Sequence, residues 1–178
     1  FSLSSTDGAE LWSFRGLPQT TRIISDPSPA VSDGRVIVPY PSGDLVALNV
    51  SDGLPAWSDS LASTRQSSLG SMSDVSRPVI AGGIVYAVGH SGRLVAIEAK
   101  TGERLWPQDN PGTQMPAVSG SMVFAVDTQS RVLAIDGRSG QTIWTVKLPA
   151  GANWSGPALG SGKLWLTSSK GALASIDA

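Results

Sequence analysis

The chain has 178 residues, enough for the core of one ordinary domain, with 40% apolar residues, 15% charged residues and a formal net charge of −1. This near-neutral balance argues against a nucleic-acid-binding protein, which needs a basic stripe, and no apolar run approaches the roughly 18 residues of a membrane-spanning helix. Because cysteine is absent, disulfides and thiolate zinc sites are excluded, whereas the cellular compartment stays open.

A repeated pattern organises the chain. Four prolines each precede two short apolar runs joined by a tight glycine-containing turn, which is typical of a β-hairpin. In chain order these segments are Pro29 before AVSDGRVIVPY, Pro78 before VIAGGIVYAVGH, Pro116 before AVSGSMVFAVD and Pro157 before ALGSGKLWLTS. A third apolar run follows each hairpin, and a turn leading to a tryptophan then occurs in TDGAELW, SDGLPAW, KTGERLW and RSGQTIW.

The spacing of the repeat predicts the fold. Successive prolines are 49, 38 and 41 residues apart, and the turn residues Gly43, Gly92, Ser130 and Gly171 show the same three spacings. A repeat of about forty residues with four strands matches a β-propeller blade of the PQQ-like or WD40-like kind. We therefore expect an all-β chain of four-stranded antiparallel blades.

The first and last residues, FSLSS and ASIDA, both align with the third strand of a blade, so the chain covers four repeat lengths of a larger ring. We expect one partial propeller domain over residues 1–178, with open edges that aggregate or pair with another copy. The repeats lie at approximately 1–28 (the end of a blade and a link), 29–77, 78–115, 116–156 and 157–178 (an incomplete blade).

The tryptophans are expected to be structural. Trp12, Trp57, Trp106 and Trp144 recur on the fourth strand, where an indole fills the gap between neighbouring blades. Trp165, on a second strand, is also expected in the core. Trp154 lies in a connection and is the tryptophan for which we expect exposure.

The two faces of the blades differ. Turns between first and second and between third and fourth strands share one face, here the turn face, and are short and uniform. The other, here the link face, carries the second-to-third turns and the links that run from each tryptophan to the next proline. These links span 17, 21, 10 and 13 positions, and loop elaboration on one face indicates function there.

The longest link ends in SLGSMSDVSRP, an almost uncharged stretch with single apolar residues and no strand or helix period. We interpret Leu69, Met72 and Val75 as apolar anchors facing a partner, with Asp74 and Arg77 orienting it. The alternative is that the three apolar side chains fold back on their own blade and that Asp74 caps a turn.

The repeats TDGAELW, KTGERLW and RSGQTIW resemble the PQQ-type propeller repeat over essentially the whole chain, and SMSDVSRPVIAGGIVYAVGHSGRLVAIEAKTGERLW resembles the BamB lipoproteins of the outer-membrane β-barrel assembly machinery. The resemblance implies an eight-bladed propeller on the periplasmic side of the outer membrane, lipid-anchored in the full-length protein. It implies a non-enzymatic scaffold that needs no cofactor or metal and binds the periplasmic domains of the barrel-inserting subunit BamA.

The same resemblance suggests where that scaffold binds. Asp74 matches the first aspartate of the family's S-D-V-D loop, whereas Ser76 stands where the second would be. On the preceding link, TTRIIS offers Arg22 and Ile23 without a clean match to the family's Leu/Arg motif.

Two other classes remain open. PQQ-type propellers include quinoprotein dehydrogenases, but the vicinal disulfide typical of those enzymes cannot form here, and the acids of the link face are scattered rather than clustered as calcium ligands. His90 is the only histidine, too few for a zinc site, and we expect a surface turn role for it. A periplasmic sensor with a small ligand in the channel is the other alternative, although the first strands offer few polar groups.

Overall fold

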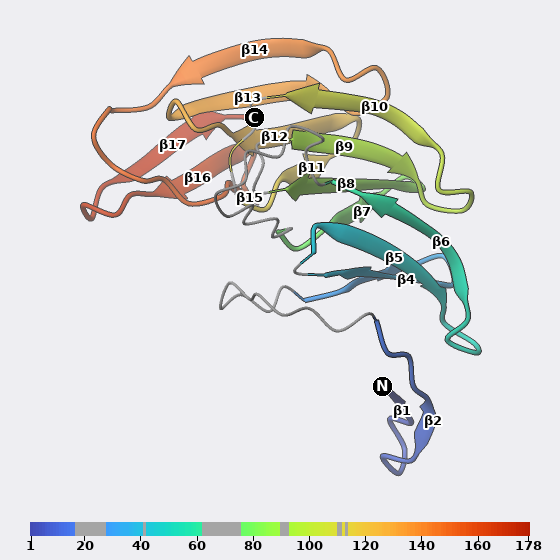
Figure 1. Ribbon diagram of the computed structural model, residues 1–178. Coiled ribbons are helices and arrows are strands. Elements are labelled where there is room, and N and C mark those ends of the chain that lie inside the picture. The colour runs from blue at the N-terminus through green and yellow to red at the C-terminus, as the bar shows by residue number, and fades with distance from the viewer. Residues whose placement is uncertain (17–27, 41, 62–75, 90–92, 110–111, 113) are drawn as a thin grey trace, which may run out of the picture.

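Four antiparallel sheets fan out in sequence order in the computed structural model, which describes residues 1–16, 28–40, 42–61, 76–89, 93–109, 112 and 114–178 (Figure 1). We name the sheets blades I to IV. Their strands are β3 (Ala30–Ser32), β4 (Arg35–Pro39), β5 (Asp44–Asn49) and β6 (Pro55–Ser60) in blade I; β7 (Val79–Ala81), β8 (Ile84–Gly89), β9 (Arg93–Glu98) and β10 (Arg104–Asp109) in blade II; β11 (Ala117–Ser119), β12 (Met122–Val126), β13 (Arg131–Asp136) and β14 (Thr142–Lys147) in blade III; and β15 (Ala158–Gly160), β16 (Lys163–Thr167) and β17 (Leu173–Asp177) in blade IV.

Before blade I, β1 (Ser2–Leu3) and β2 (Glu10–Trp12) form a separate antiparallel pair. Within each blade the strands pair in chain order, and the first strands β3, β7, β11 and β15 contact one another in series. The described residues contain no helix, and so none long and apolar enough to cross a membrane. The predicted all-β fold of propeller blades is confirmed.

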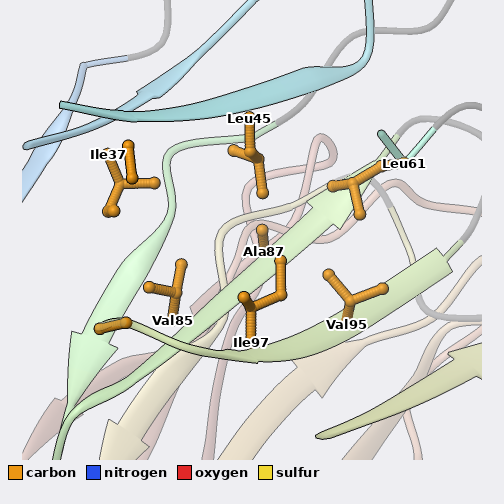
Figure 2. Packing of buried hydrophobic residues seen from close by; sticks show 9 residues of the cluster. Ile37, Leu45, Leu61, Val85, Ala87, Val95 and Ile97 are labelled. Atoms are coloured by element: carbon orange, nitrogen blue, oxygen red, sulfur yellow. The ribbon is translucent and has the colours of Figure 1, made fainter. Parts of the chain in front are cut away.

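The middle strands of blades II and III are apolar on both faces, and both faces are covered by neighbouring blades. Figure 2 shows Ile37 and Leu45 of blade I packed against Val85, Ala87 and Val95 of blade II. Comparable clusters fill the interfaces of blades II with III and III with IV. A strand buried on two sides reads as a continuous apolar run rather than an alternating one, which explains segments such as VYAV and VLAI.

In three of the repeats a fourth-strand tryptophan bridges to the following blade. The indole Nε1 groups of Trp12, Trp57 and Trp106 donate to the carbonyl oxygens of Val50, Ala99 and Gly137, at 2.8, 2.9 and 3.0 Å respectively. These acceptors are equivalent positions of consecutive repeats. The predicted inter-blade role of these three tryptophans is confirmed.

Each of these indoles also lies on a glycine of the next turn. A Cβ at Gly102 or Gly140 would lie 2.6 Å from the ring of Trp57 or Trp106, and both glycines have positive φ. The third-to-fourth turn thus needs glycine twice, for its backbone conformation and for its contact with the indole.

The expectation that Trp165 is a core residue is wrong for this chain. Trp165 occupies the position of Ile37, Tyr86 and Phe124, which are fully buried by the next blade, yet 38% of its surface is exposed. The cause is that Trp165 points away from blade III, toward the side of blade IV that no described residue covers.

We predict that Gly140→Ala destabilises the chain much more than Gly34→Ala. Both glycines have φ +73°, but a Cβ at Gly34 meets nothing within 4 Å. Gly34→Ala should therefore cost only the backbone strain, about 1 kcal/mol, whereas Gly140→Ala should cost about 2 kcal/mol more because the Trp106 ring must move. Urea unfolding would measure both, and equal losses would contradict the proposed indole contact.

Candidate functional site

The links enter the blades on the link face, beside the second-to-third turns. The last residues of three links donate main-chain hydrogen bonds to the end of the second strand of the blade they enter. Ser76 N donates to Val88 O at 2.8 Å, Gly112 N to Val126 O at 2.8 Å, and Ser155 N to Thr167 O at 2.9 Å. Each of these three links is therefore fixed near its exit to the blade that follows.

Most of the predicted site residues, namely Leu69, Met72, Asp74, Val75, Arg22 and Ile23, lie outside the described residues, as does His90. Arg77 is described and its side chain is exposed on the link face. The two residues that bracket segment 62–75 are both fixed. Leu61 is buried in the core between blades I and II and donates its N–H to Gly43 O at 2.8 Å, while Ser76 is bonded to β8.

Tyr40 lies at the start of the second-to-third turn of blade I on this face and packs against the first link. Its ring lies against Gly16, where any side chain would collide with it. Burial raises the pKa of the Tyr40 phenol, because the phenolate would lose hydration, and a hydrogen bond with the Gly16 main chain partly opposes this shift. The phenol therefore stays neutral and serves as packing for the link.

Asp127 is a link-face residue that sequence reasoning missed. Its side chain is fully buried; Oδ1 accepts the N–H groups of Gln129 and Arg131 at 2.9 and 2.8 Å, and Oδ2 accepts Arg131 Nε at 2.6 Å. Ser168 occupies the same turn position in blade IV and its Oγ accepts two main-chain N–H groups in the same way. The signal in the sequence was a short polar residue three positions before the aligned turn residues Ser130 and Gly171.

A cavity of about 350 Å³ lies beside this turn, between blades III and IV. It is lined by amide and hydroxyl side chains, which include Gln114, Thr128, Ser130 and Asn153, and by Trp154. Such a lining offers hydrogen bonds but no free charge, because the Asp127 carboxylate is already engaged by its own turn.

The prediction that Trp154 is exposed is wrong. Trp154 is 6% exposed, packs into the cluster between blades III and IV, and donates its Nε1–H to Pro149 O at 3.1 Å. The physical reason is that its link folds over the end of blade IV, where Trp154 forms a β-bridge with Ser168. The indole therefore closes the core from the link face.

Two described acids of this face, Asp59 and Asp109, are engaged by arginines, whereas Asp44 accepts a hydrogen bond from the Ser42 hydroxyl. Asp59 binds the guanidinium of Arg104 in the next blade, with contacts of 2.6 and 3.1 Å, and Asp109 binds Arg93 at 3.3 Å. Among the residues that the structure describes, no group of three His, Cys, Asp or Glu side chains is placed to hold a metal ion.

On the turn face the carboxylates serve the turns themselves. The pKa of Asp136 is lowered chiefly by the Ser139 main-chain N–H and hydroxyl, and that of Glu98 by hydrogen bonds from Thr101. These turns are local, uniform structures whose polar side chains are used internally.

A family model described as outer membrane protein assembly factor BamB matches residues 1–146. Curated relatives include that factor from Nitrosomonas eutropha, 28% identical over 61% of this chain and 27% of the relative, and from Alkalilimnicola ehrlichii, 36% identical over 48% of this chain and 23% of the relative. The matched segments thus cover only about a quarter of these proteins.

Among solved structures, BamB from Moraxella catarrhalis has a TM-score of 0.78 at 17% identity, over 96% of this chain and 56% of that one. Two computationally designed proteins share the fold. Ika4 has a TM-score of 0.76 at 15% identity, over 96% of this chain and 98% of its own, and Ika8 has 0.77 at 14%, over 99% and 51%.

We predict that Asp127→Ala lowers the free energy of unfolding by about 2 kcal/mol or more, because two turn N–H groups and the Arg131 guanidinium lose their acceptor. Asp109→Ala is the matched control, since Arg93 and Arg131 occupy equivalent positions and the Asp109 side chain is 78% exposed. Its loss should be about 0.5 kcal/mol or less. Urea unfolding compares the two, and similar losses would refute the turn-fixing role of Asp127.

Proposed function

The chain belongs to the family described as outer membrane protein assembly factor BamB, and we propose that it forms part of a non-catalytic scaffold whose link face binds the periplasmic domains of a BamA-like barrel-assembly subunit. The protein would act at the periplasmic face of the outer membrane, held there by a lipid anchor on the full-length protein. Neither a cofactor nor a nucleic acid takes part in this function.

The observation that carries the proposal is the contrast between the two faces. The turn face is closed by short turns that use their own polar groups, whereas the link face collects chain segments of uneven length held at their ends by main-chain hydrogen bonds. A rigid frame that presents irregular segments on one side is the usual architecture of a protein-binding surface. The match to the family covers blades I to III and the whole of segment 62–77.

Within this face we assign partner contact to the segment between Leu61 and Pro78. Leu69, Met72 and Val75 would supply the apolar centre, and Asp74 and Arg77 the polar rim. Exposure of Arg77 and burial of both Leu61 and Pro78 support this assignment, because the segment leaves the core at one end and re-enters it at the other. Arg22 and Ile23, on the preceding link, would extend the contact toward blade I.

A quinoprotein activity has no comparable support. The described link-face acids Asp59, Asp109 and Asp127 are paired with Arg104, Arg93 and Arg131 respectively. The scaffold proposal uses these residues as structure, in agreement with their contacts.

We predict that Asp74→Arg weakens binding of the BamA-like periplasmic domains by about 30-fold or more, which corresponds to about 2 kcal/mol, because a charge is reversed within the interface. The measurement is a calorimetric titration of a propeller that contains residues 1–178 against these soluble domains. Glu103→Arg is the matched control, since Glu103 is exposed on the turn face.

Equal effects of the two charge reversals would show that binding responds to net charge and not to the link face. Unchanged binding by Asp74→Arg would move the interface away from segment 62–77. No saturable binding by the unsubstituted protein would overturn the scaffold proposal and favour a ligand-binding propeller.

A further inference from the structure

The joint between blades I and II has a cavity of about 380 Å³ on the turn face. This volume lies within the range of pockets that hold small molecules. The lining comes from the first-to-second turns of both blades and from the residues that end β9 and follow it, namely Asp33, Arg35, Gly83, Glu98, Ala99 and Lys100. Because the glycine and the alanine contribute almost no side chain, the four charged residues determine the chemistry of the cavity.

Arg35 is a cation without a counterion in its own blade. Its Nη1 donates to Asn49 Oδ1 at 2.7 Å, whereas the equivalent pair of blade IV joins a cation to a carboxylate, Lys163 Nζ to Asp177 Oδ1 at 2.7 Å. The Nε of Arg35 is buried and has no hydrogen-bond partner, so the guanidinium is partly desolvated as well as unneutralised. The neutral Asn49 stands where the other three blades have the carboxylates of Glu98, Asp136 and Asp177.

The two carboxylates of the cavity are likewise outside any ion pair. Asp33 Oδ2 accepts the Ser32 hydroxyl at 2.9 Å, and Glu98 Oε2 accepts the Thr101 N–H at 2.6 Å. Hydrogen bonds from Thr101 lower the pKa of Glu98, so this carboxyl is ionised at neutral pH. Among the residues that the structure describes, no ion pair joins either carboxylate to a cation of the cavity. Opposite charges thus surround the cavity without contacting one another.

The fold does not require these charges. The first-to-second turns of blades II and III, AGGI and SGSM, carry none, and Ile84 and Met122 stand there at the position of Arg35. Asp33 has φ +49°, in the region that favours glycine, and blades II and III have glycine at that position. The next two joints form without charged side chains at these two positions, so the charges of the first joint are available for a ligand.

We propose that this cavity binds a small zwitterion, a molecule with one carboxylate and one ammonium group, which is the chemistry shared by free amino acids and short peptides. Arg35 and Lys100 would bind the carboxylate, for which the planar guanidinium is well suited. Asp33 and Glu98 would bind the ammonium group. A ligand with a single charge would also face two groups of its own sign, which opposes its binding. The site lies on the turn face, so it does not compete with the partner contact assigned to the link face.

Calorimetric titration of L-alanine and of L-alanyl-L-alanine into a propeller that contains residues 1–178 tests the proposal. We expect saturable binding of at least one probe, and the probe that binds identifies the source as a free amino acid or a peptide. Arg35→Gln should weaken binding about tenfold or more. The matched control is Arg138→Gln, which removes the same charge from an exposed turn-face residue outside the cavity. Equal effects of the two variants, or no saturable binding of either probe, would overturn the proposal.

A second comparison tests the two charges of the ligand. The N-acetylated and the C-amidated forms of the probe that binds each lack one charge, and each should bind about tenfold more weakly or worse. Undiminished binding of the acetylated form would show an anion site, and undiminished binding of the amide a cation site; either result would overturn the zwitterion proposal. Lys100→Gln keeps the test independent of folding, because Lys100 is exposed, and it should weaken binding several-fold.

Discussion

The contact on which this architecture depends is the indole that the fourth-strand tryptophans Trp12, Trp57 and Trp106 place on the next blade. Each ring contacts a glycine and donates to the carbonyl three residues before it, so one residue fixes how closely the two blades approach there. A contact with a defined donor, acceptor and stacking surface is directional, unlike the aliphatic packing beside it. The aliphatic clusters then contribute most of the burial, at a spacing that the indoles determine.

This arrangement makes every blade depend on two neighbours. The middle strands are apolar on both sides, so a blade at the end of a series always leaves one side uncovered, as Leu173 and Val36 show. In a ring the dependence becomes an advantage, because closure removes both uncovered sides at once and leaves only the fourth-strand edges at the rim.

Much of the fold could be predicted from the sequence because the repeat displays each structural requirement several times. The turn glycines, the middle-strand apolar runs and the fourth-strand tryptophans recur with one spacing, and the structure places them as that spacing requires. The predicted exposure of Trp154 and the predicted burial of Trp165 were wrong for the same reason. The exposure of each indole depends on what covers it: a folded link covers Trp154, and no described residue covers the outer side of Trp165. The structural role of Asp127 was not predicted because the sequence alone does not distinguish a buried aspartate from an exposed one. The distinction requires the positions of the turn N–H groups that the carboxylate accepts. For the link residues Leu69 to Val75, neither periodicity nor repeat equivalence exists, so only the position of the segment on the link face follows from the sequence.

These constraints explain why the turn face has short, uniform turns while the link face has links of uneven length. On the turn face a longer loop would have to move the glycine on which an indole lies, and the carboxylates of Glu98 and Asp136 are committed to the turn N–H groups. On the link face no fourth-strand indole depends on loop length, and three links are held at their exits through bonds such as Ser76 N to Val88 O, although the last link is also held by the buried Trp154. The structural cost of a change in loop length is therefore expected to be larger on the turn face. Binding surfaces arise where variation is tolerated by a rigid support, which is why the proposed partner contact is assigned to the link face.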